Sequence, residues 1–224
     1  MRSALRWFFI ICTLAALAPA AHAQLHIEIT GAGAQRIPVA IVPFAGEGAL
    51  GIPGTNAAIT DVVRADLERS GLFRALQLPP LDPLPTETTP VNYPEWRSRL
   101  ADALLAGSVA VRPDGRYEVR FRLYDVVKQQ PLGAIAYTLA KTQTRATGHR
   151  IADFVYEKLT GEKGVFSTRI AYVTATGAGQ ASRYALMVAD ADGYNPQTVV
   201  RSNEPLLSPA WSPDGRKLAY VSFE

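Results

Sequence analysis

A repeated pentapeptide near the end of the printed sequence constrains the fold more than any other feature. The segment Arg169–Val173 (RIAYV) recurs 48 residues later as Lys217–Val221 (KLAYV). A strand-and-turn signature precedes the second copy, formed by Trp211, Ser212, Pro213, Asp214 and Gly215. Short strand-rich units that repeat every 40–50 residues or so are typical of β-propeller blades. Because blades close into rings of about four to eight, we expect this chain to be the front part of a longer protein.

The first 23 residues have the pattern of a secretory signal peptide. Two arginines lead into the apolar run Trp7–Ala18, which is too short to span a bilayer comfortably. Ala21 and Ala23 form a small-x-small cleavage site. We therefore expect cleavage after Ala23, with Gln24 as the first mature residue and no membrane span left afterwards. A retained membrane anchor is the alternative.

Composition then excludes several classes of protein. The only cysteine, Cys12, lies in the leader, so the mature chain is expected to hold no disulfide and no cysteine-bound metal. Removing Arg2 and Arg6 from the 23 basic residues leaves 21 against 20 acidic ones. No run of basic residues forms a stripe that could neutralise many phosphates, so a nucleic-acid partner is not expected.

Residues 37–160 predict a small α/β sandwich, a mixed sheet with two main helices. The near-continuous apolar run 37–44 predicts a buried strand. A glycine-rich loop and a helix over 55–70 follow, the helix capped by Thr55 or Asn56 and ended by Gly71. A strand over 72–78 would complete a right-handed strand-helix-strand crossover.

The second half of this region begins with an irregular segment. Residues 79–94 hold six prolines and exclude regular structure. A short helix is expected over 95–103, with Trp96 and Leu100 facing inward. Three strands follow, joined by tight turns, over 104–111, 117–127 and 133–141. An amphipathic helix over 144–160 buries Ile151, Phe154, Val155 and Leu159 and ends at Gly161.

Past a compact hinge, Gly161–Gly164, the pattern changes to short strands alone, over 169–174, 184–190 and 197–201. This change of periodicity predicts a domain boundary. We expect a signal peptide (1–23), a mobile strand and spacer (24–36), an α/β domain (37–162) and the first part of a β-propeller (163–224). The propeller part alone should expose strand edges and be poorly ordered.

No catalytic constellation is present in the sequence. Asp190–Asn195 superficially resembles a calcium loop, but its glycine is in the fourth position and Tyr194 is in the fifth, so a β-turn is the better interpretation. His26 and His149 are the only histidines after processing and have no partner at metal-ligand spacing, so neither is expected to bind a metal or act as a general base. Ser208 and Ser212 lack a nucleophile-elbow context. No segment points to paired carboxylates at glycosidase separation. Neither a cofactor nor a metal is expected.

The first mature segment is the candidate binding site. It alternates polar and apolar side chains and precedes a Gly/Ala spacer, Gly31–Ala34. Such a strand could fold back onto its own domain or pair with the open sheet edge of another protein. Its residues are Gln24, Leu25, His26, Ile27, Glu28, Ile29 and Thr30.

Several motifs together resemble the TolB family, soluble periplasmic proteins of the Tol-Pal system of Gram-negative bacteria. The likeness covers the whole chain. Besides the leader, the matching segments are Ile37–Phe44 (IPVAIVPF), Ala65–Phe73 (ADLERSGLF), Glu157–Gly161 (EKLTG), Arg169–Val173, Asp192–Asn195 (DGYN) and Leu207–Gly215 (LSPAWSPDG).

The resemblance implies an α/β N-terminal domain like the anticodon-binding domain of some tRNA synthetases, followed by an all-β six-bladed β-propeller. It also implies a non-enzymatic role through protein partners. The first mature residues, 24–30, would contact TolA, which is anchored in the inner membrane. The propeller would contact Pal, the peptidoglycan-associated lipoprotein, through later blades beyond Glu224.

Two other functions are weighed against this one. Propellers also precede α/β-hydrolase domains in secreted peptidases, so the chain could be the front of a serine hydrolase. The anticodon-domain likeness suggests a nucleic-acid binder, but the near-neutral mature charge and the export signal argue against it.

Overall fold

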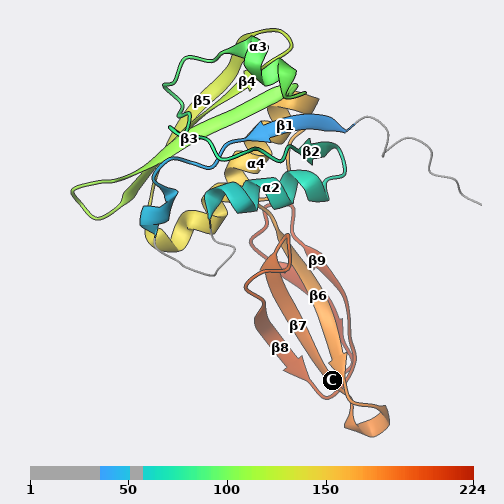
Figure 1. Cartoon of the computed structure of the whole chain (residues 1–224). Helices are drawn as coiled ribbons and strands as arrows, with labels where there is room; N and C mark the ends of the chain where they lie inside the picture. Colours follow the sequence, from blue (N-terminus) through green and yellow to red (C-terminus); the bar gives the residue numbers. More distant parts are fainter. Residues whose placement is uncertain (1–35, 51–57) are drawn as a thin grey trace, which may run out of the picture. The chain divides into compact units, whose positions relative to one another are not determined.

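The computed structural model describes residues 36–50 and 58–224. Its first sheet has five strands, in the spatial order β2-β1-β3-β4-β5, as Figure 1 shows. The strands are β1 (Ile37–Ile41), β2 (Phe73–Ala75), β3 (Ala103–Val111), β4 (Tyr117–Asp125) and β5 (Gln130–Leu139). Strand β1 pairs in parallel with both β2 and β3, whereas β3, β4 and β5 are antiparallel. The mixed sheet of the predicted fold class is confirmed.

The crossover from β1 to β2 contains the 3-10 helix η1 (Glu47–Leu50) and helix α2 (Ile59–Arg69). Helix α2 begins later than the predicted residue 55, and the predicted caps Thr55 and Asn56 lie outside the described residues. The Glu47 carboxylate accepts hydrogen bonds from the backbone N–H (3.2 Å) and the hydroxyl (3.0 Å) of Thr60. A side chain from η1 therefore satisfies one of the free N–H groups at the start of α2.

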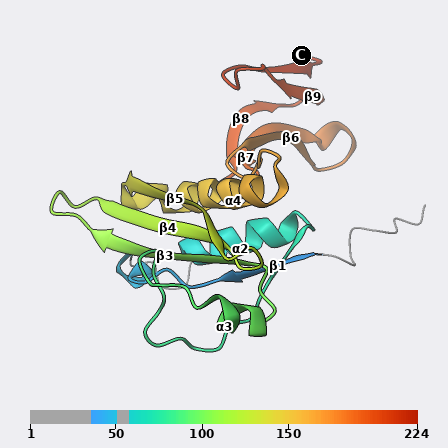
Figure 2. The ribbon, with the colours of Figure 1, turned by 90° about the horizontal axis from the view of Figure 1, so that it is seen from above.

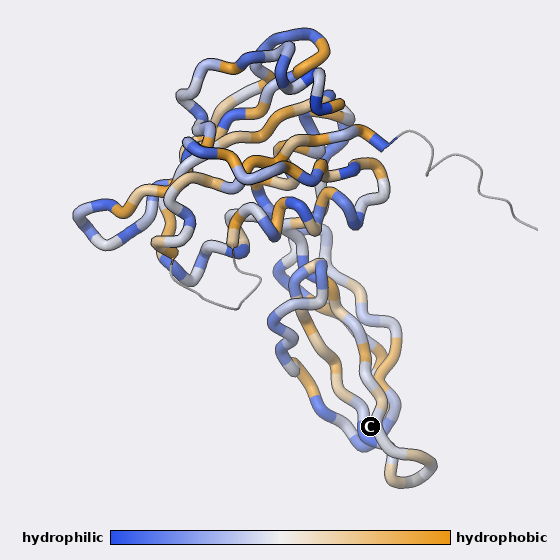
Figure 3. The backbone as a smooth tube through the Cα atoms, in the orientation of Figure 1, coloured by the Kyte–Doolittle hydropathy of each residue, from blue (hydrophilic) through white to orange (hydrophobic). Residues whose placement is uncertain are grey.

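Each face of the sheet carries its own hydrophobic core, and Figure 2 shows the helices on opposite sides. One face packs against α2 and α4 (Thr144–Thr160) through fully buried side chains that include Phe121 and Ile151. The other is covered by α3 (Tyr93–Ser98) and the proline-rich segment, with Trp96 buried there. Figure 3 shows the apolar residues following the strands between these layers. Burial on both faces explains why 37–44 is apolar without alternation.

Helix α4 matches the prediction at both ends, with Gly161 in the left-handed conformation just after Thr160. Its approach to α2 depends on Gly148, where a Cβ would lie 2.7 Å from the Cβ of Val62. Ile151 and Val155 are buried as predicted, and Phe154 and Leu159 pack at the margin of the core.

The prediction for the helix after the proline-rich segment was partly wrong. Helix α3 begins at Tyr93 and ends at Ser98, instead of spanning 95–103. Pro94 lies in its first turn, where a missing N–H costs nothing, so the last proline of the segment starts the helix. Leu100 lies past the end of the helix, with a φ of 62°, and is 69% exposed instead of facing inward.

The antiparallel strands are close to their predicted ranges, with two shifts. Strand β4 ends at Asp125 instead of residue 127, and β5 covers 130–139 instead of 133–141. A bulge lies between Leu123 and Tyr124. The turn of the β4–β5 hairpin covers residues 126–129, earlier than the 128–132 left between the two predicted strands.

Beyond α4, all described strands are antiparallel. A three-stranded sheet contains β6 (Arg169–Thr176), β7 (Arg183–Asp190) and β8 (Gln197–Ser202), with the 3-10 helix η3 (Gly179–Ala181) between β6 and β7. A second sheet contains β9 (Leu206–Trp211) and β10 (Leu218–Ser222). These sheets form the start of a propeller, as predicted.

The segment between α4 and β6 is held to α4. The Asp153 carboxylate accepts the backbone N–H of Phe166 (2.7 Å) and of Ser167 (3.1 Å), and it also contacts the Ser167 hydroxyl. The ring of Phe166 is buried against Tyr156, with 5.7 Å between the ring centroids. The predicted hinge is therefore followed by residues that belong to the core of the α/β domain.

Candidate functional site

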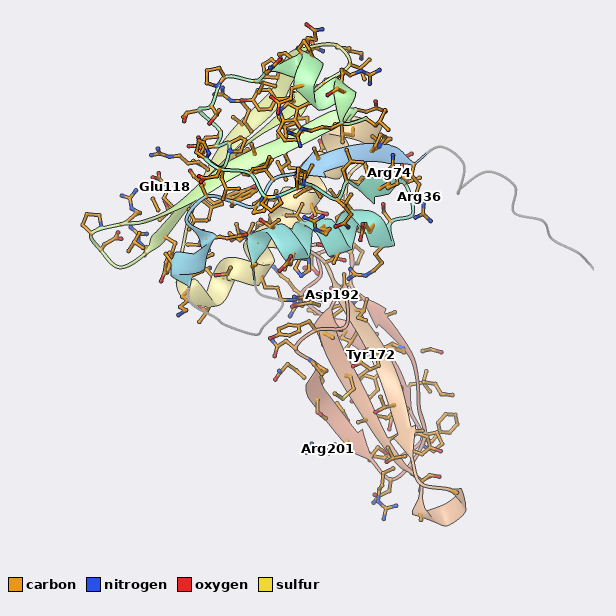
Figure 4. All side chains as sticks on the ribbon, in the orientation of Figure 1. Arg36, Arg74, Glu118, Tyr172, Asp192 and Arg201 are labelled. Carbon is orange, nitrogen blue, oxygen red and sulfur yellow. The ribbon has the colours of Figure 1, made fainter. Side chains whose placement is uncertain are left out.

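Among the described residues, one group of buried ionisable side chains joins three separate elements. Asp66 lies on α2, His149 on α4, and Asp192 in the turn between β7 and β8. Their side chains are 1%, 3% and 4% exposed. Figure 4 shows Asp192 at the end of its hairpin. We call these three residues the Asp-His-Asp cluster.

The imidazole of His149 lies between the two carboxylates. Its Nδ1 is 2.5 Å from Asp66 Oδ2, and its Nε2 is 3.8 Å from Asp192 Oδ2. The Nε2 atom is buried and has no hydrogen-bond partner in the structure. One edge of the ring is thus fixed by a direct contact, while the other faces a carboxylate slightly beyond hydrogen-bond distance.

Two arginines extend the cluster. Arg69, one turn along α2, donates to Asp66 Oδ1 at 2.8 Å. Arg145 of α4 pairs with Asp192 Oδ2, and its guanidinium stacks on the ring of Tyr194, 4.2 Å from the centroid. Each aspartate therefore has a cationic partner of its own besides His149.

This geometry is a poor metal site, although ligand atoms of the three residues lie within 4.8 Å of one another. The 2.5 Å contact between Nδ1 and Asp66 leaves no room for an ion there. An ion at Nε2 would reach only Asp192, and that carboxylate oxygen already pairs with Arg145. Two ligands beside a guanidinium do not make a stable zinc site. The arrangement is better suited to binding a proton.

The sequence contained a signal for this cluster that spacing rules for metal ligands miss. Asp66 lies seven residues after Ile59, on the buried face of α2 between Val63 and Leu67. His149 has a similar place on the buried face of α4. An ionisable residue on an apolar helix face requires a buried partner. The partner could not be identified, because the three residues are far apart in the chain.

The turn that carries Asp192 has the predicted β-turn form and not that of a calcium loop. Gly193 N–H donates to Asp190 O at 2.8 Å, and Asp190 N–H donates to Tyr194 O at 3.0 Å. Asp192 Oδ1 accepts the backbone N–H of Tyr194 at 3.0 Å, which leaves Oδ2 directed at the cluster.

The sequence-predicted partner-binding strand, Gln24–Thr30, lies outside the described residues, as do the cleavage residues Ala21 and Ala23. The repeat motif lies inside them. Trp211 ends β9, and Ser212, Pro213, Asp214 and Gly215 form the turn to β10, where Gly215 N–H donates to Ser212 O at 2.8 Å. Ser212 Oγ is 2.5 Å from Asp214 Oδ1, so this hydroxyl has a structural partner.

The two copies of the repeated pentapeptide occupy β6 and β10. The second copy pairs with the strand before it, β9, whereas the first pairs with the strand after it, β7. In the described part of the chain, residues 161–168 precede β6 and form no strand. Within the described residues, the β6-β7-β8 sheet therefore lacks a counterpart of β9.

A pocket of about 390 Å³ lies between the proline-rich segment and α3. Its charged lining residues include Glu95 and Arg99, which pair with each other at 2.9 Å. Asp82 is a third charged lining residue of this pocket. Among residues 36–50 and 58–224, no helix combines the length and apolarity needed to cross a membrane.

Comparison with known proteins matches both parts of the chain to TolB family models. The model of the TolB amino-terminal domain matches residues 25–132, and that of the TolB beta propeller domain matches residues 156–224. A Tol-Pal system protein TolB from Methylobacillus flagellatus is 54% identical over 205 residues, covering 92% of this chain and 46% of the relative. One from Aromatoleum aromaticum is 56% identical over 215 residues, covering 96% and 48%.

A solved structure supports the same family relationship. The crystal structure of TolB from Acinetobacter baumannii superposes with a TM-score of 0.73 at 40% identity, over 89% of this chain and 47% of that one. The chain spans about half the length of the curated relatives it matches. With both TolB family models matched in the same order as the two folds described above, the chain belongs to the TolB family.

Proposed function

We propose that this chain is the front part of a non-enzymatic protein of the Tol-Pal system that acts in the periplasm by binding other proteins. One observation supports the proposal most directly: an α/β domain matching the TolB amino-terminal model precedes strands matching the TolB propeller model. Export through a leader, cleaved after Ala23, would place the mature protein in the periplasm. The domain limits we propose are 24–36, 37–162 and 163–224.

The segment Gln24–Thr30 is the proposed contact with a TolA-like protein of the inner membrane. Its alternating side chains suit pairing with a sheet edge, where main-chain hydrogen bonds give affinity and alternate side chains give specificity. The Gly/Ala spacer Gly31–Ala34 separates this segment from β1, which begins at Ile37. A spacer of small residues would let the strand reach a partner, although both lie outside the described residues.

Later blades of the propeller are the proposed contact with a Pal-like lipoprotein of the outer membrane. The protein would then link the two membranes, supporting outer-membrane integrity and invagination during cell division. A strand from the distant C-terminal part would fill the place before β6 and close the ring. The lack of a described counterpart of β9 in the β6-β7-β8 sheet supports this closure.

Binding at the two ends can be coupled through the state of the 24–30 strand. A strand docked on its own protein cannot pair with the TolA-like partner, whereas a released strand can. The Pal-like partner would shift this balance only if it binds the two states with different affinities.

Deletion of residues 24–30 from the mature protein tests the assignment. Affinity for the TolA-like partner, measured by calorimetry, should be lost, while a variant with Ala32→Ser and Ala34→Ser in the spacer should keep it. Undiminished binding by the deletion variant would refute the contact. If the deletion leaves the affinity for the Pal-like partner unaltered, the coupling is removed from the proposal.

A further inference from the structure

The protonation state of His149 determines how many carboxylates its ring can hold. A neutral imidazole carries one N–H, and a doubly protonated ring carries two. With neutral His149 donating from Nδ1 to Asp66, the lone pair of Nε2 faces the oxygen of Asp192 at 3.8 Å. Protonation turns this contact between two acceptors into one between a donor and an acceptor.

We propose that the Asp-His-Asp cluster is a proton-sensitive latch that holds the β7–β8 turn against helices α2 and α4. Protonated His149 bridges Asp66 and Asp192, and the latch is tight. Without that proton, Nε2 has no N–H to donate to Asp192, and the turn is held less strongly. The buried and unpartnered Nε2 is the observation that points to this role.

The other charged groups facing the cluster set the strength of the effect. From α2, Arg69 pairs with Asp66 and is half exposed. From α4, Arg145 pairs with Asp192, and from the turn Tyr194 stacks on Arg145. Arg145 attracts Asp192 whether or not His149 is protonated. The proton on His149 therefore strengthens an existing contact between the turn and α4 and does not create that contact.

The direction of the pH dependence follows from proton linkage. The docked turn favours the protonated ring, so the docked state binds more protons than the undocked one. Docking therefore weakens as the pH rises.

Distance measurements on the full-length mature protein test the latch. Spin labels are attached through Lys128→Cys, at an exposed position of the α/β domain, and Arg201→Cys, at an exposed position of β8. Cys12 is the only cysteine of this chain, and any other in the protein is replaced. The undocked fraction should rise about tenfold between pH 5.5 and pH 8, because the docked state then loses roughly one charge-assisted hydrogen bond.

Three variants identify the group responsible. His149→Gln should make the distance distribution independent of pH, and Asp192→Asn should remove most of the response. Asn at 192 still accepts the Tyr194 N–H, so the turn is kept. Asp190→Asn, in the same turn but outside the cluster, should respond as the wild type does. An unchanged wild-type distribution between the two pH values, or a full response in Asp192→Asn, overturns the latch even if His149→Gln fails to fold.

Discussion

Gly164 lies directly against Asp153 of α4. A Cβ at Gly164 would fall 2.3 Å from Asp153 Oδ1 and 2.6 Å from the Cα of the same residue. The absence of a side chain at Gly164 therefore lets the following segment reach the carboxylate. This approach places Phe166 in the core and sets the path by which the chain enters the propeller strands.

Gly164→Ala should destabilise the α/β domain by about 1–3 kcal/mol, because the methyl group forces the segment away from α4. Thermal unfolding followed by circular dichroism measures the change. Gly48→Ala is the matched control, since a Cβ at Gly48 meets nothing within 4 Å. Equal melting temperatures for the two variants would contradict the steric argument.

Asp153→Asn should weaken the hold on the segment after α4. An amide side chain has one oxygen acceptor where the carboxylate has two, so the N–H of Phe166 or of Ser167 loses its partner. We expect a loss of about 1–3 kcal/mol. Trypsin should also cut faster at the exposed Lys163. Ser167→Ala, which removes only the hydroxyl contact, should show a smaller acceleration, and the reverse order would rule out the carboxylate as the anchor.

The packing of Phe166 also predicts where the α/β domain can be cut. A fragment of residues 24–168 should be more stable than one of residues 24–160 by about 2–3 kcal/mol, the gain from burying one phenylalanine side chain. Urea unfolding of both fragments measures the difference. If the shorter fragment is equally stable, Phe166 is not part of that core.

Local signals determine which parts of this fold could be predicted. The helical spacing of apolar residues and the glycine at position 161 predict a helix over 144–160. Tertiary packing does not override these local signals, so α4 has the predicted bounds. The prediction that Leu100 faces inward was wrong. Helical spacing places a side chain on the inner face only while the helix continues, and the backbone at Leu100 is already left-handed. The helix-ending turn leaves that side chain exposed.

The Asp-His-Asp cluster lies beyond such local rules. Asp66 and His149 are 83 residues apart, and only the packing of α2 on α4 brings their side chains together. The third member, Asp192, comes from a turn whose own sequence indicated nothing more than a turn. For the predicted binding strand, Gln24–Thr30, the sequence pattern is clear, but the residues lie outside the described part of the chain.

Glu47 predicts a second pH dependence, within the α/β domain. Burial raises the pKa of the Glu47 carboxyl above its ordinary value, against the lowering effect of its hydrogen bonds from Thr60. The folded state thus holds this proton more tightly than the unfolded state does, and its stabilising effect is lost as the pH rises through the folded pKa. Relative to Glu47→Gln, the wild type should lose stability as the pH rises above the ordinary pKa of a glutamate side chain. Urea unfolding of both proteins at several pH values tests this, and a constant difference would contradict it.

The propeller strands should not form an ordered unit by themselves. Their buried core is small, with Leu186 and Leu206 as its largest fully buried side chains. Meanwhile Val221 and Phe223 on or beside β10 are 48% and 60% exposed. Unpaired strand edges next to exposed apolar side chains favour association between molecules. A fragment of residues 166–224 should therefore give broad or poorly dispersed amide NMR signals, whereas residues 24–168 should give dispersed ones. Sharp, dispersed signals throughout 166–224 would contradict this prediction.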